Sequence, residues 1–586
     1  MVTQQVWIGA AAGFAGDRAD ASGPLIATLA RHDGPRFLIF ETLAERTLAL
    51  AQLDRLADPT RGEVPALRRL LWPALAPCAA AGIKIIGNFG GANPFGAAAK
   101  IRSWAIELGC PNLKIAVVAG DDLRDMFSSA DFARMETDGA LLRDEPAIVA
   151  ANAYLGADAI AAALSAGADI VVTGRVADPA LVLGPLKHSF GWADDDWDRL
   201  AAGILAGHLL ECGSQVTGGY FADPGVKDVP GMAMLGYPIA EVEPDGTFVV
   251  TKPAGTGGLV DRRTVTEQAL YEIHDPADYL TPDVVLDLTQ VELAEIGPDR
   301  VRVTGARGHP RPETLKATIC FDGGFLAEAE ISYAGPNAKS RAALAIDTVR
   351  KRLARLHPAL RVRADLIGVV SVFGDTAGSR LNAELPNFAD GDLRVRFAAE
   401  ATDRAAAECL LDEVEALYCA GPAGGGGVRR RLTPDAPAAQ RVLPGGSQAR
   451  RTASLVSGDG MTRAVSLYEL AHARSGDKGN RLNIVVICHE PRFYEPLRER
   501  LTAAFVARVF RERKPSAVRR YELPKLNAFN FVLDDVLDGG VNGSLGLDGH
   551  GKTLSFLLLS AEIEMPTELL TPAAEPTPEP MSGGSR

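Results

Sequence analysis

An apolar run at Ile170–Val172 is followed by side chains that could bind and transform a small molecule. Thr173 and Arg175 come directly after the run and bring a hydroxyl and a guanidinium to its end. These groups are suited to polarising a carbonyl and to pairing with a substrate carboxylate. Asp178 could move a proton, or it could only cap the helix that Pro179 begins.

Two other loops place polar groups directly after apolar runs. Asp17 and Arg18 close a loop of small residues, and Asn88 follows Ile83–Ile86. We expect Asn88 to polarise a carbonyl, and Asp17 is the alternative to Asp178 for proton transfer. The loop after Asn88 either binds a ligand through bare backbone N–H groups and a second amide or is only a tight turn. Its ligand-binding candidates are Gly90, Gly91 and Asn93.

A second chemically mixed stretch lies near the carboxyl terminus of the chain. His472, Arg474, Ser475, Asp477 and Lys478 crowd into one predicted loop between two strands. We expect this loop to fold back onto the first lobe, where Lys478 or Arg474 meets an anionic group and His472 transfers a proton. The alternative is a polar hairpin in which Asp477 and Lys478 form a surface pair worth under ~1 kcal/mol.

A lysine before a Gly-rich turn is a further candidate anion site. Lys252 precedes Gly255, Thr256, Gly257 and Gly258, which could cradle a phosphate or a carboxylate. The order differs from the Gly-Lys-Thr of a P-loop, and the glycines of the first loop do not match the dinucleotide pattern. The sequence therefore requires no cofactor.

Candidate metal ligands are few. His208, Glu211 and Cys212 could bind zinc, or Cys212 could be a nucleophile with His208 as its base. A single cysteine before a glycine is equally typical of a packed helix end. Asp121 and Asp122 could hold a divalent cation, but with no third ligand at fixed spacing a solvated turn explains them better. We predict no metal site.

Composition excludes several classes of function. The chain has 586 residues, a net charge of −13 and a pI of about 5.3, which argues against nucleic acid or an anionic membrane as a partner. The seven cysteines form no Cys-x-x-Cys pair, as expected for the cytoplasm. Neither a secretory signal nor a membrane span is indicated.

The elements that must position these residues alternate between strand and helix. Apolar runs predict strands that end in Gly-rich or polar loops, as in an α/β fold with a layered, mostly parallel sheet. Glu41 ends one such strand and is either a site acid or a salt-bridged rim residue. The predicted strands are 6–8, 37–40, 83–86, 113–118 and 170–172, and the predicted helices are 45–53, 98–108, 146–164, 179–186 and 201–210.

Four changes of pattern divide the chain. We expect an α/β lobe over 1–215, an α+β lobe over 216–431, a linker over 432–462 and a small α+β domain over 463–566, before a disordered tail at 567–586. The second lobe should contain a hairpin over 237–252, a helix over 267–273 opened by a capping box at Thr264, and a helix over 340–356. Residues 420–431 are either a flexible joint or an anion nest.

Seven motifs give the chain a resemblance to the acyclic terpene utilisation (AtuA) family. Those similar to its amino-terminal domain are Gly13–Arg18, Thr173–Asp178, Glu211–Gly219 and Thr251–Gly258. Those similar to its carboxy-terminal module are Leu467–Ile484, Tyr521–Phe531 and Leu547–Lys552. The resemblance implies a ferredoxin-like fold for the last domain and a role in the breakdown of citronellol- or geraniol-type terpenoids through acyl-CoA intermediates.

The resemblance and the strand-end residues together predict a lyase or hydratase of branched acyl-CoA or carboxylate compounds. Acyl-CoA would then be the substrate, and the enzyme is expected to be a homo-oligomer. The alternative is a non-catalytic assembly or scaffold partner of an acyl-CoA carboxylase, because Gly-rich linkers and an appended small domain suit a protein that docks others.

Overall fold

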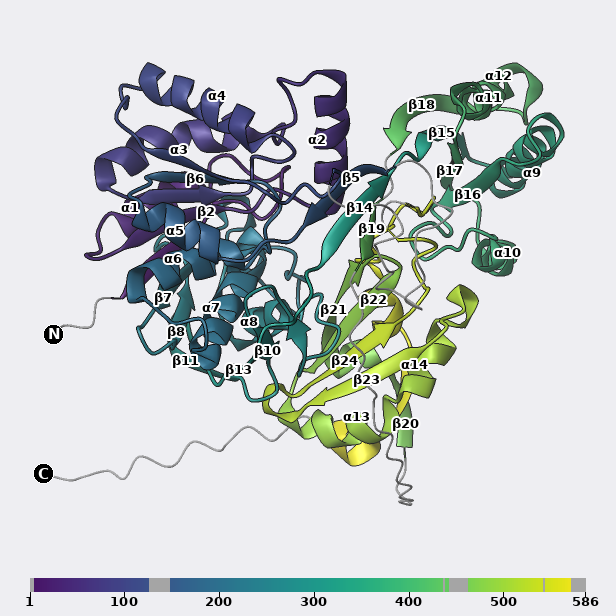
Figure 1. The fold of residues 1–586 in the computed structure, drawn as a ribbon. Coiled ribbons are helices and arrows are strands. Elements are labelled where there is room, and N and C mark those ends of the chain that lie inside the picture. The colour runs from purple at the N-terminus through teal and green to yellow at the C-terminus, as the bar shows by residue number, and fades with distance from the viewer. Residues whose placement is uncertain (1–4, 126–147, 436–437, 442–461, 541–542, 571–586) are drawn as a thin grey trace, which may run out of the picture.

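The computed structural model describes residues 5–125, 148–435, 438–441, 462–540 and 543–570 (Figure 1). In these segments no helix combines the length and the apolar character that crossing a membrane requires. Most of the predicted linker and residues 571–586 of the predicted tail lie outside the described residues.

A nine-stranded sheet forms the centre of the amino-terminal part. Five strands pair in parallel, and four more extend the sheet antiparallel from β1. The parallel strands are apolar and largely buried, which is typical of a sheet covered on both faces. In sheet order the strands are β11 (Glu292–Gly297), β12 (Arg300–Thr304), β8 (Phe248–Thr251), β7 (Ile239–Val242), β1 (Val6–Ala10), β2 (Arg36–Phe40), β3 (Lys84–Gly87), β6 (Ile170–Thr173) and β4 (Ile115–Val118).

Helices cover both faces of this sheet (Figure 1). Ile170 and Val172 of β6 contribute to the core on one face, whereas Val171 contributes to the core on the other. The predicted α/β fold is therefore confirmed. Helices on the first face are α1 (Ser22–Leu29), α2 (Glu45–Ala57), α3 (Leu67–Ala81) and α4 (Pro94–Glu107), and those on the second are α5 (Asp158–Ser165), α6 (Ala180–Phe190), α7 (Trp197–Leu210) and α8 (Arg262–Ala269).

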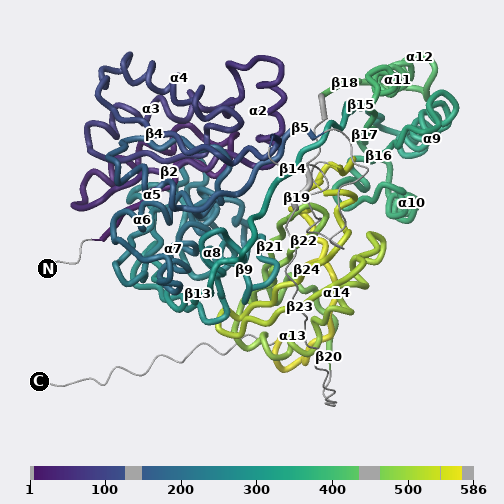
Figure 2. The backbone as a smooth tube through the Cα atoms, viewed as in Figure 1, coloured from purple at the N-terminus to yellow at the C-terminus, as the bar shows by residue number. Residues whose placement is uncertain are grey.

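A strand replaces the first half of the helix predicted at 146–164. Residues Ile148–Ala153 form β5, which pairs with β14 (Ala317–Phe321), and β14 pairs in turn with β19 (Ala438–Arg441). The backbone trace shows β5 and β14 running between the layered part and the next lobe (Figure 2). Strand pairing and close packing thus override the helix propensity of the alanines in β5.

A separate four-stranded antiparallel sheet forms the next lobe. The predicted joint or anion nest at 420–431 is wrong, because its second half, residues 426–431, belongs to a strand of this sheet. The register places Arg431 opposite Glu328 and Arg429 opposite Glu330, so basic side chains face acidic ones across the strands. The lobe consists of β16 (Arg361–Ile367), β17 (Asp392–Ala401), β15 (Gly324–Ala334), β18 (Gly426–Asp435), α9 (Ala338–Leu356), α10 (Ser379–Glu384), α11 (Arg404–Glu415) and α12 (Leu417–Ala420).

Other boundaries also differ from prediction. The nine-stranded sheet continues past residue 215, because the predicted hairpin supplies β7 and β8 to it. Helix α8 begins after Asp261, whose side chain and Thr264 form the capping box, so the predicted start at 267 is wrong. β18 and β19 occupy the start of the predicted linker. A small sheet contains β9 (Tyr279–Leu280), β10 (Val285–Asp287) and β13 (Arg307–His309).

The carboxy-terminal domain is a four-stranded antiparallel sheet with helices on one face. Alternate residues of β22 divide between two cores: Ile484 packs within the domain, whereas Val485 packs into the core of the amino-terminal part. The domain is therefore docked through its own sheet. Its elements are β21 (Ala471–Lys478), β22 (Arg481–Cys488), β24 (Ala528–Leu533), β23 (Val518–Leu523), α13 (Tyr494–Arg500), α14 (Ala503–Val509), α15 (Leu554–Leu559) and the pair β20 (Thr462–Ser466) and β25 (Glu562–Pro566).

The stretch predicted as a loop at 472–478 is strand β21. Because side chains alternate along a strand, His472, Arg474 and Lys478 face the amino-terminal part, where they contact residues from Gln215 to Glu272. Gly476 lies on the same face, and a Cβ there would come within 2.5 Å of the Glu272 side chain. The glycine permits this close contact.

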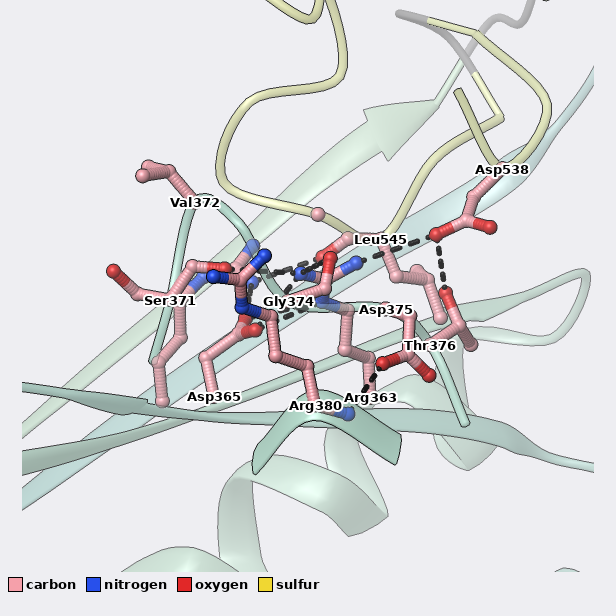
Figure 3. Close-up of polar contacts among 12 residues, drawn as sticks. Arg363, Asp365, Ser371, Val372, Gly374, Asp375, Thr376, Arg380, Asp538 and Leu545 are labelled. Atoms are coloured by element: carbon pink, nitrogen blue, oxygen red, sulfur yellow. Dashed lines mark hydrogen bonds and ion pairs between the residues drawn. The ribbon is translucent and has the colours of Figure 1, made fainter. Parts of the chain in front are cut away.

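A buried ion-pair network joins the four-stranded lobe to the carboxy-terminal domain (Figure 3). Asp365 accepts hydrogen bonds from Arg363 at 2.9 Å and from Arg396 at 3.0 Å. Arg363 also lies 3.5 Å from Asp538, and Arg396 donates to the backbone oxygen of Leu545 at 2.9 Å. The contacts to Asp538 and Leu545 cross the boundary between the two domains.

Candidate active site

A cavity of about 490 Å³, here called the main cavity, lies where the ends of the parallel strands meet strand β21. A second cavity of about 290 Å³, the side cavity, adjoins it. The residues that line both cavities, here called the shared wall, are Glu45, Asp178, Glu211, Glu272 and Lys478.

Besides Glu41, Glu211 and Cys212, five residues singled out from the sequence line the main cavity. Asp17 and Arg175 follow strands β1 and β6, whose carboxyl ends meet at one edge of the sheet. Asp477 and Lys478 come from the end of β21, more than 290 residues further along the chain. The fifth is Asp178. The carboxy-terminal domain thus contributes directly to the wall of this cavity.

Glu41 follows β2 directly, and its buried carboxyl group lines the main cavity. Its Oε1 accepts hydrogen bonds from the backbone N–H of Leu43 at 2.8 Å and from the side-chain amide of Asn88 at 2.9 Å. Burial raises the pKa of Glu41 to about 8, with a further contribution from the charge of Asp178 that Arg175 opposes. The carboxyl group is therefore neutral near pH 7. Because Oε1 already accepts two N–H groups, the proton resides on Oε2.

The buried guanidinium of Arg175 holds Asp178 at the cavity. It donates hydrogen bonds to the backbone oxygens of Leu43 and Val176 and forms an ion pair with the Asp178 carboxylate. It also lies 4.5 Å from the centre of the Tyr154 ring. Among the described residues no side chain caps the start of α6, so the capping role considered for Asp178 is wrong.

Glu45 lies on the shared wall. Its surroundings favour the ionised carboxylate, whereas those of Glu41 favour the neutral acid. It accepts a hydrogen bond from the Tyr154 hydroxyl at 2.8 Å and lies 3.9 Å from the ammonium of Lys316. Burial alone would raise its pKa, but the charges of Lys316 and Lys478 outweigh burial and lower the pKa of Glu45 to about 2. A neutral and an ionised carboxyl therefore line the same cavity, as in enzymes that assign acid and base roles to paired carboxyls.

Lysines of the carboxy-terminal domain form ion pairs with acids that line the main cavity. Lys478 pairs with Glu272, and Lys552 lies 3.1 Å from Glu272 and 3.4 Å from Asp477. Lys552 also contacts the hydroxyl of Tyr271. The surface pair between Asp477 and Lys478 that was considered from the sequence is therefore not formed, since each side chain has another partner.

The possible zinc or thiol site contains an acid with a raised pKa. The Nδ1 atom of His208 lies 2.9 Å from Oε1 of Glu211, while Oε2 has no hydrogen-bond partner in the described residues. Burial raises the pKa of Glu211, and burial also raises that of the Cys212 thiol, which therefore remains protonated and a weak nucleophile. Within the described segments no group of three or more His, Cys, Asp or Glu is arranged to hold a metal ion.

Several predicted residues near the strand ends have structural partners outside the cavities. Asn93 caps α4 by accepting a hydrogen bond from the backbone of Gly96 at 3.0 Å. Thr173 is buried and donates to the oxygen of Gly174. Arg18 pairs with Asp20 at 2.8 Å. Gly90 and Gly91 belong to the turn before α4 and line neither cavity.

Asp121, expected in a solvated turn, is instead buried. It accepts a hydrogen bond from the backbone N–H of Arg175 at 2.9 Å and from the Asn152 side chain at 2.8 Å. Asp121 thus fixes the backbone at the end of β6, and Asp122 pairs with Arg124.

The Lys252 turn also lies outside both cavities. Lys252 pairs with Asp299 at 3.0 Å and donates to the backbone oxygen of Thr256. The backbone of this turn packs against the segment that contains Met234, because the N–H of Gly257 donates a hydrogen bond to the backbone oxygen of Met234 at 2.8 Å. The remaining glycines of this turn are Gly255 and Gly258.

The other predicted residues of β21 contact the amino-terminal part or, in the case of Ser475, residues of the carboxy-terminal domain itself. His472 Nδ1 lies 2.5 Å from Glu267 of α8. Arg474 lies 3.9 Å from the centre of the Tyr271 ring. Ser475 donates to the backbone oxygen of Gly551 at 2.8 Å, on the opposite face of the strand. None of these three residues lines a described cavity.

Sequence reasoning identified Glu41 as a possible site acid but missed Glu45, Glu272 and Lys316, which come from segments with no distinctive spacing. Lys552 lies in a motif that resembles the family's carboxy-terminal module, but no role at the site was predicted for it. Only the fold brings them to the cavities.

Asn88 is expected to tune the acidity of Glu41. Its side-chain N–H favours the ionised form of Glu41, and its Oδ1 accepts from the backbone N–H of Thr42 at 2.7 Å. Asn88→Ala should therefore raise the pKa of Glu41 above about 8 and lower the free energy of unfolding by ~1–3 kcal/mol. An infrared titration of the protonated carboxyl C=O stretch and urea unfolding measure the two effects.

Asn93→Ala is the matched control, because it removes a helix cap worth about 1 kcal/mol without touching Glu41. If Asn88→Ala left the titration of Glu41 unchanged, Asn88 would have no role in setting its acidity.

Comparison with known proteins accounts for most of the chain. Residues 6–444 match the model of the acyclic terpene utilisation family protein AtuA, and residues 465–564 match that of the AtuA ferredoxin-like domain. A search of the curated proteins finds no match.

Proposed function

Because the chain belongs to the acyclic terpene utilisation (AtuA) family and ends in its ferredoxin-like domain, we propose that it is a lyase or hydratase. Its substrates are branched acyl-CoA or carboxylate intermediates of citronellol- or geraniol-type catabolism. The observation that carries the proposal is the buried Glu41 carboxyl group in the lining of the main cavity, whose Oε1 accepts two N–H groups and whose pKa burial raises to about 8.

The proposed chemistry is proton transfer between the cavity wall and the substrate. In a dehydration, Glu41 donates its Oε2 proton to the leaving hydroxyl oxygen, and the Asp178 carboxylate accepts the proton from the α-carbon. Water leaves as the carbon–carbon double bond forms. Hydration is the same sequence in reverse. Arg175 acts as a positioning residue, because its ion pair orients Asp178.

The charge of the main cavity restricts what part of a substrate enters it. Its lining includes seven carboxyl groups but only three lysine or arginine cations, Arg175, Lys478 and Lys552. Each of these cations already pairs with an acid of the lining. The acyl portion of a thioester therefore enters the cavity, while the phosphates of CoA remain outside it.

Turnover by the purified full-length chain tests the proposal. The probes are branched β-hydroxyacyl-CoA and enoyl-CoA thioesters and the corresponding free acids, followed by mass spectrometry. We expect the gain or loss of one water, or cleavage into two fragments. The alternative function is non-catalytic assembly of an acyl-CoA carboxylase. Folded protein that converts none of the probes but copurifies with a carboxylase from its host would favour that alternative and contradict the enzyme proposal.

A further inference from the structure

Lys316 is a cavity lysine that the proposed acid–base chemistry does not use. It immediately precedes strand β14 and lines the side cavity. Its ammonium lies 3.9 Å from Oε1 of Glu45 and 4.2 Å from the centre of the Tyr154 ring. Among the described residues it donates no hydrogen bond, whereas Lys478 and Lys552 each donate at least one. The Lys316 ammonium is therefore held loosely at the cavity wall.

The electrostatic surroundings of Lys316 favour the neutral amine. Burial lowers its pKa to about 8, with a further contribution from the charge of Lys478 that Glu45 opposes. An ordinary lysine has a pKa of about 10.4. Since only an uncharged amine is a nucleophile, burial and the neighbouring cation both activate Lys316, as they activate lysines of imine-forming enzymes.

The side cavity suits a small, partly apolar ligand. Apolar surface from Ala177, Tyr279 and Leu280 lines it together with the acids of the shared wall. Its volume of about 290 Å³ corresponds to roughly ten non-hydrogen atoms, at ~30 Å³ for each atom of the size of a water molecule. A short branched aldehyde or ketone fits this space.

We propose that Lys316 is a nucleophilic amine that forms an imine with the carbonyl carbon of an aldehyde or ketone bound in the side cavity. This inference goes beyond the proposed hydratase or lyase function, which requires no covalent intermediate.

The covalent step balances without an external reagent. The Lys316 nitrogen attacks the carbonyl carbon, the carbonyl oxygen takes up two hydrogens and leaves as water, and a C=N bond replaces the C=O bond. Overall, an ammonium and a carbonyl give an iminium and one water, whose two hydrogens originate from the ammonium. Glu211 lies on the shared wall with a raised pKa and an unpartnered Oε2, so its neutral form can protonate the departing oxygen.

Reductive trapping tests the imine directly. The full-length protein is incubated at pH 8 with isovaleraldehyde and cyanoborohydride, and the adducts are located by peptide mass spectrometry. We expect Lys316 to be modified at least about tenfold faster than the exposed Lys351, because a far larger fraction of Lys316 is neutral at this pH. Lys316→Arg, which retains the positive charge, should lose this fast adduct, whereas Lys351→Arg should keep it.

Modification of Lys316 at the rate of Lys351 would overturn the inference, as would an unchanged fast adduct in Lys316→Arg. Peptide mapping of the unsubstituted protein decides the question even if that variant fails to fold. The assay contains neither a thioester nor a hydration step. A negative trapping result would therefore leave the proposed hydratase or lyase function standing. Trapping of Lys316 would support the imine even if the protein showed no hydratase or lyase activity.

Discussion

Glu41→Gln is expected to lower kcat for hydration or cleavage of the acyl substrate by about 10²–10⁴-fold, with little change in stability. Glutamine has nearly the same shape, and its side-chain oxygen can still accept the hydrogen bonds from Leu43 and Asn88. It cannot donate a proton to a leaving oxygen. The loss should therefore appear in kcat and in kcat/KM alike, because the missing interaction belongs to the transition state.

Glu63→Gln is the matched control, since Glu63 pairs with Lys100 and lines neither described cavity. It should leave kcat within a factor of about two, because Glu63 lines neither described cavity and is not placed to contact the substrate. Steady-state kinetics and a thermal melt of each variant provide the comparison. A Glu41→Gln enzyme with full kcat would remove Glu41 from the chemistry.

Asp365→Asn should cause the largest loss of stability, about 3–5 kcal/mol of unfolding free energy. Asp365 is 2% exposed and accepts hydrogen bonds from the buried guanidinium groups of both Arg363 and Arg396. Removing its charge leaves two buried cations with a reduced counter-charge. Since Arg363 and Arg396 also contact Asp538 and Leu545 of the carboxy-terminal domain, we expect the docking of that domain to weaken as well.

The control for Asp365→Asn is Asp347→Asn on helix α9. Asp347 forms an exposed pair with Lys351, so its loss should change the unfolding free energy by less than about 0.5 kcal/mol. Urea unfolding curves of both variants measure the difference. Equal midpoints for the two variants would show that the buried network contributes no more than a surface pair.

Local patterns identified the elements whose burial leaves a clear trace in sequence. Ile170–Val172 is apolar because β6 is covered on both faces, and the turn at Asp245 and Gly246 marks the hairpin that supplies β7 and β8. Strand β5 lacks such a trace, because its alanines favour a helix and only pairing with β14 makes it a strand. Strand β18 could not be predicted either, because its glycines and arginines resemble a linker. It forms a strand by pairing with β15, which places acidic residues opposite the arginines.

Residues of the site could be predicted from the sequence only where they follow a recognisable strand, because the strand then determines where they lie. Asp17, Arg175 and Asp178 could be identified because the carboxyl ends of parallel strands meet at one edge of a sheet. The roles of Arg175 and Asn88 could not, because their partners Leu43 and Glu41 lie on another strand end. The raised pKa of Glu41 depends on burial, which only the assembled fold defines.

The most direct test of this account is whether Glu41 carries a proton at neutral pH. Difference infrared spectroscopy of the full-length protein against Glu41→Gln isolates the C=O stretch of that single carboxyl group. We predict a protonated-carboxyl band that is present at pH 6, falls to half its intensity near the pKa of about 8 and vanishes above it, since deprotonation accompanies rising pH. Absence of the band at pH 6, with Glu41 already ionised as an ordinary glutamate of pKa about 4.3 would be, would contradict the assignment of Glu41 as the proton donor.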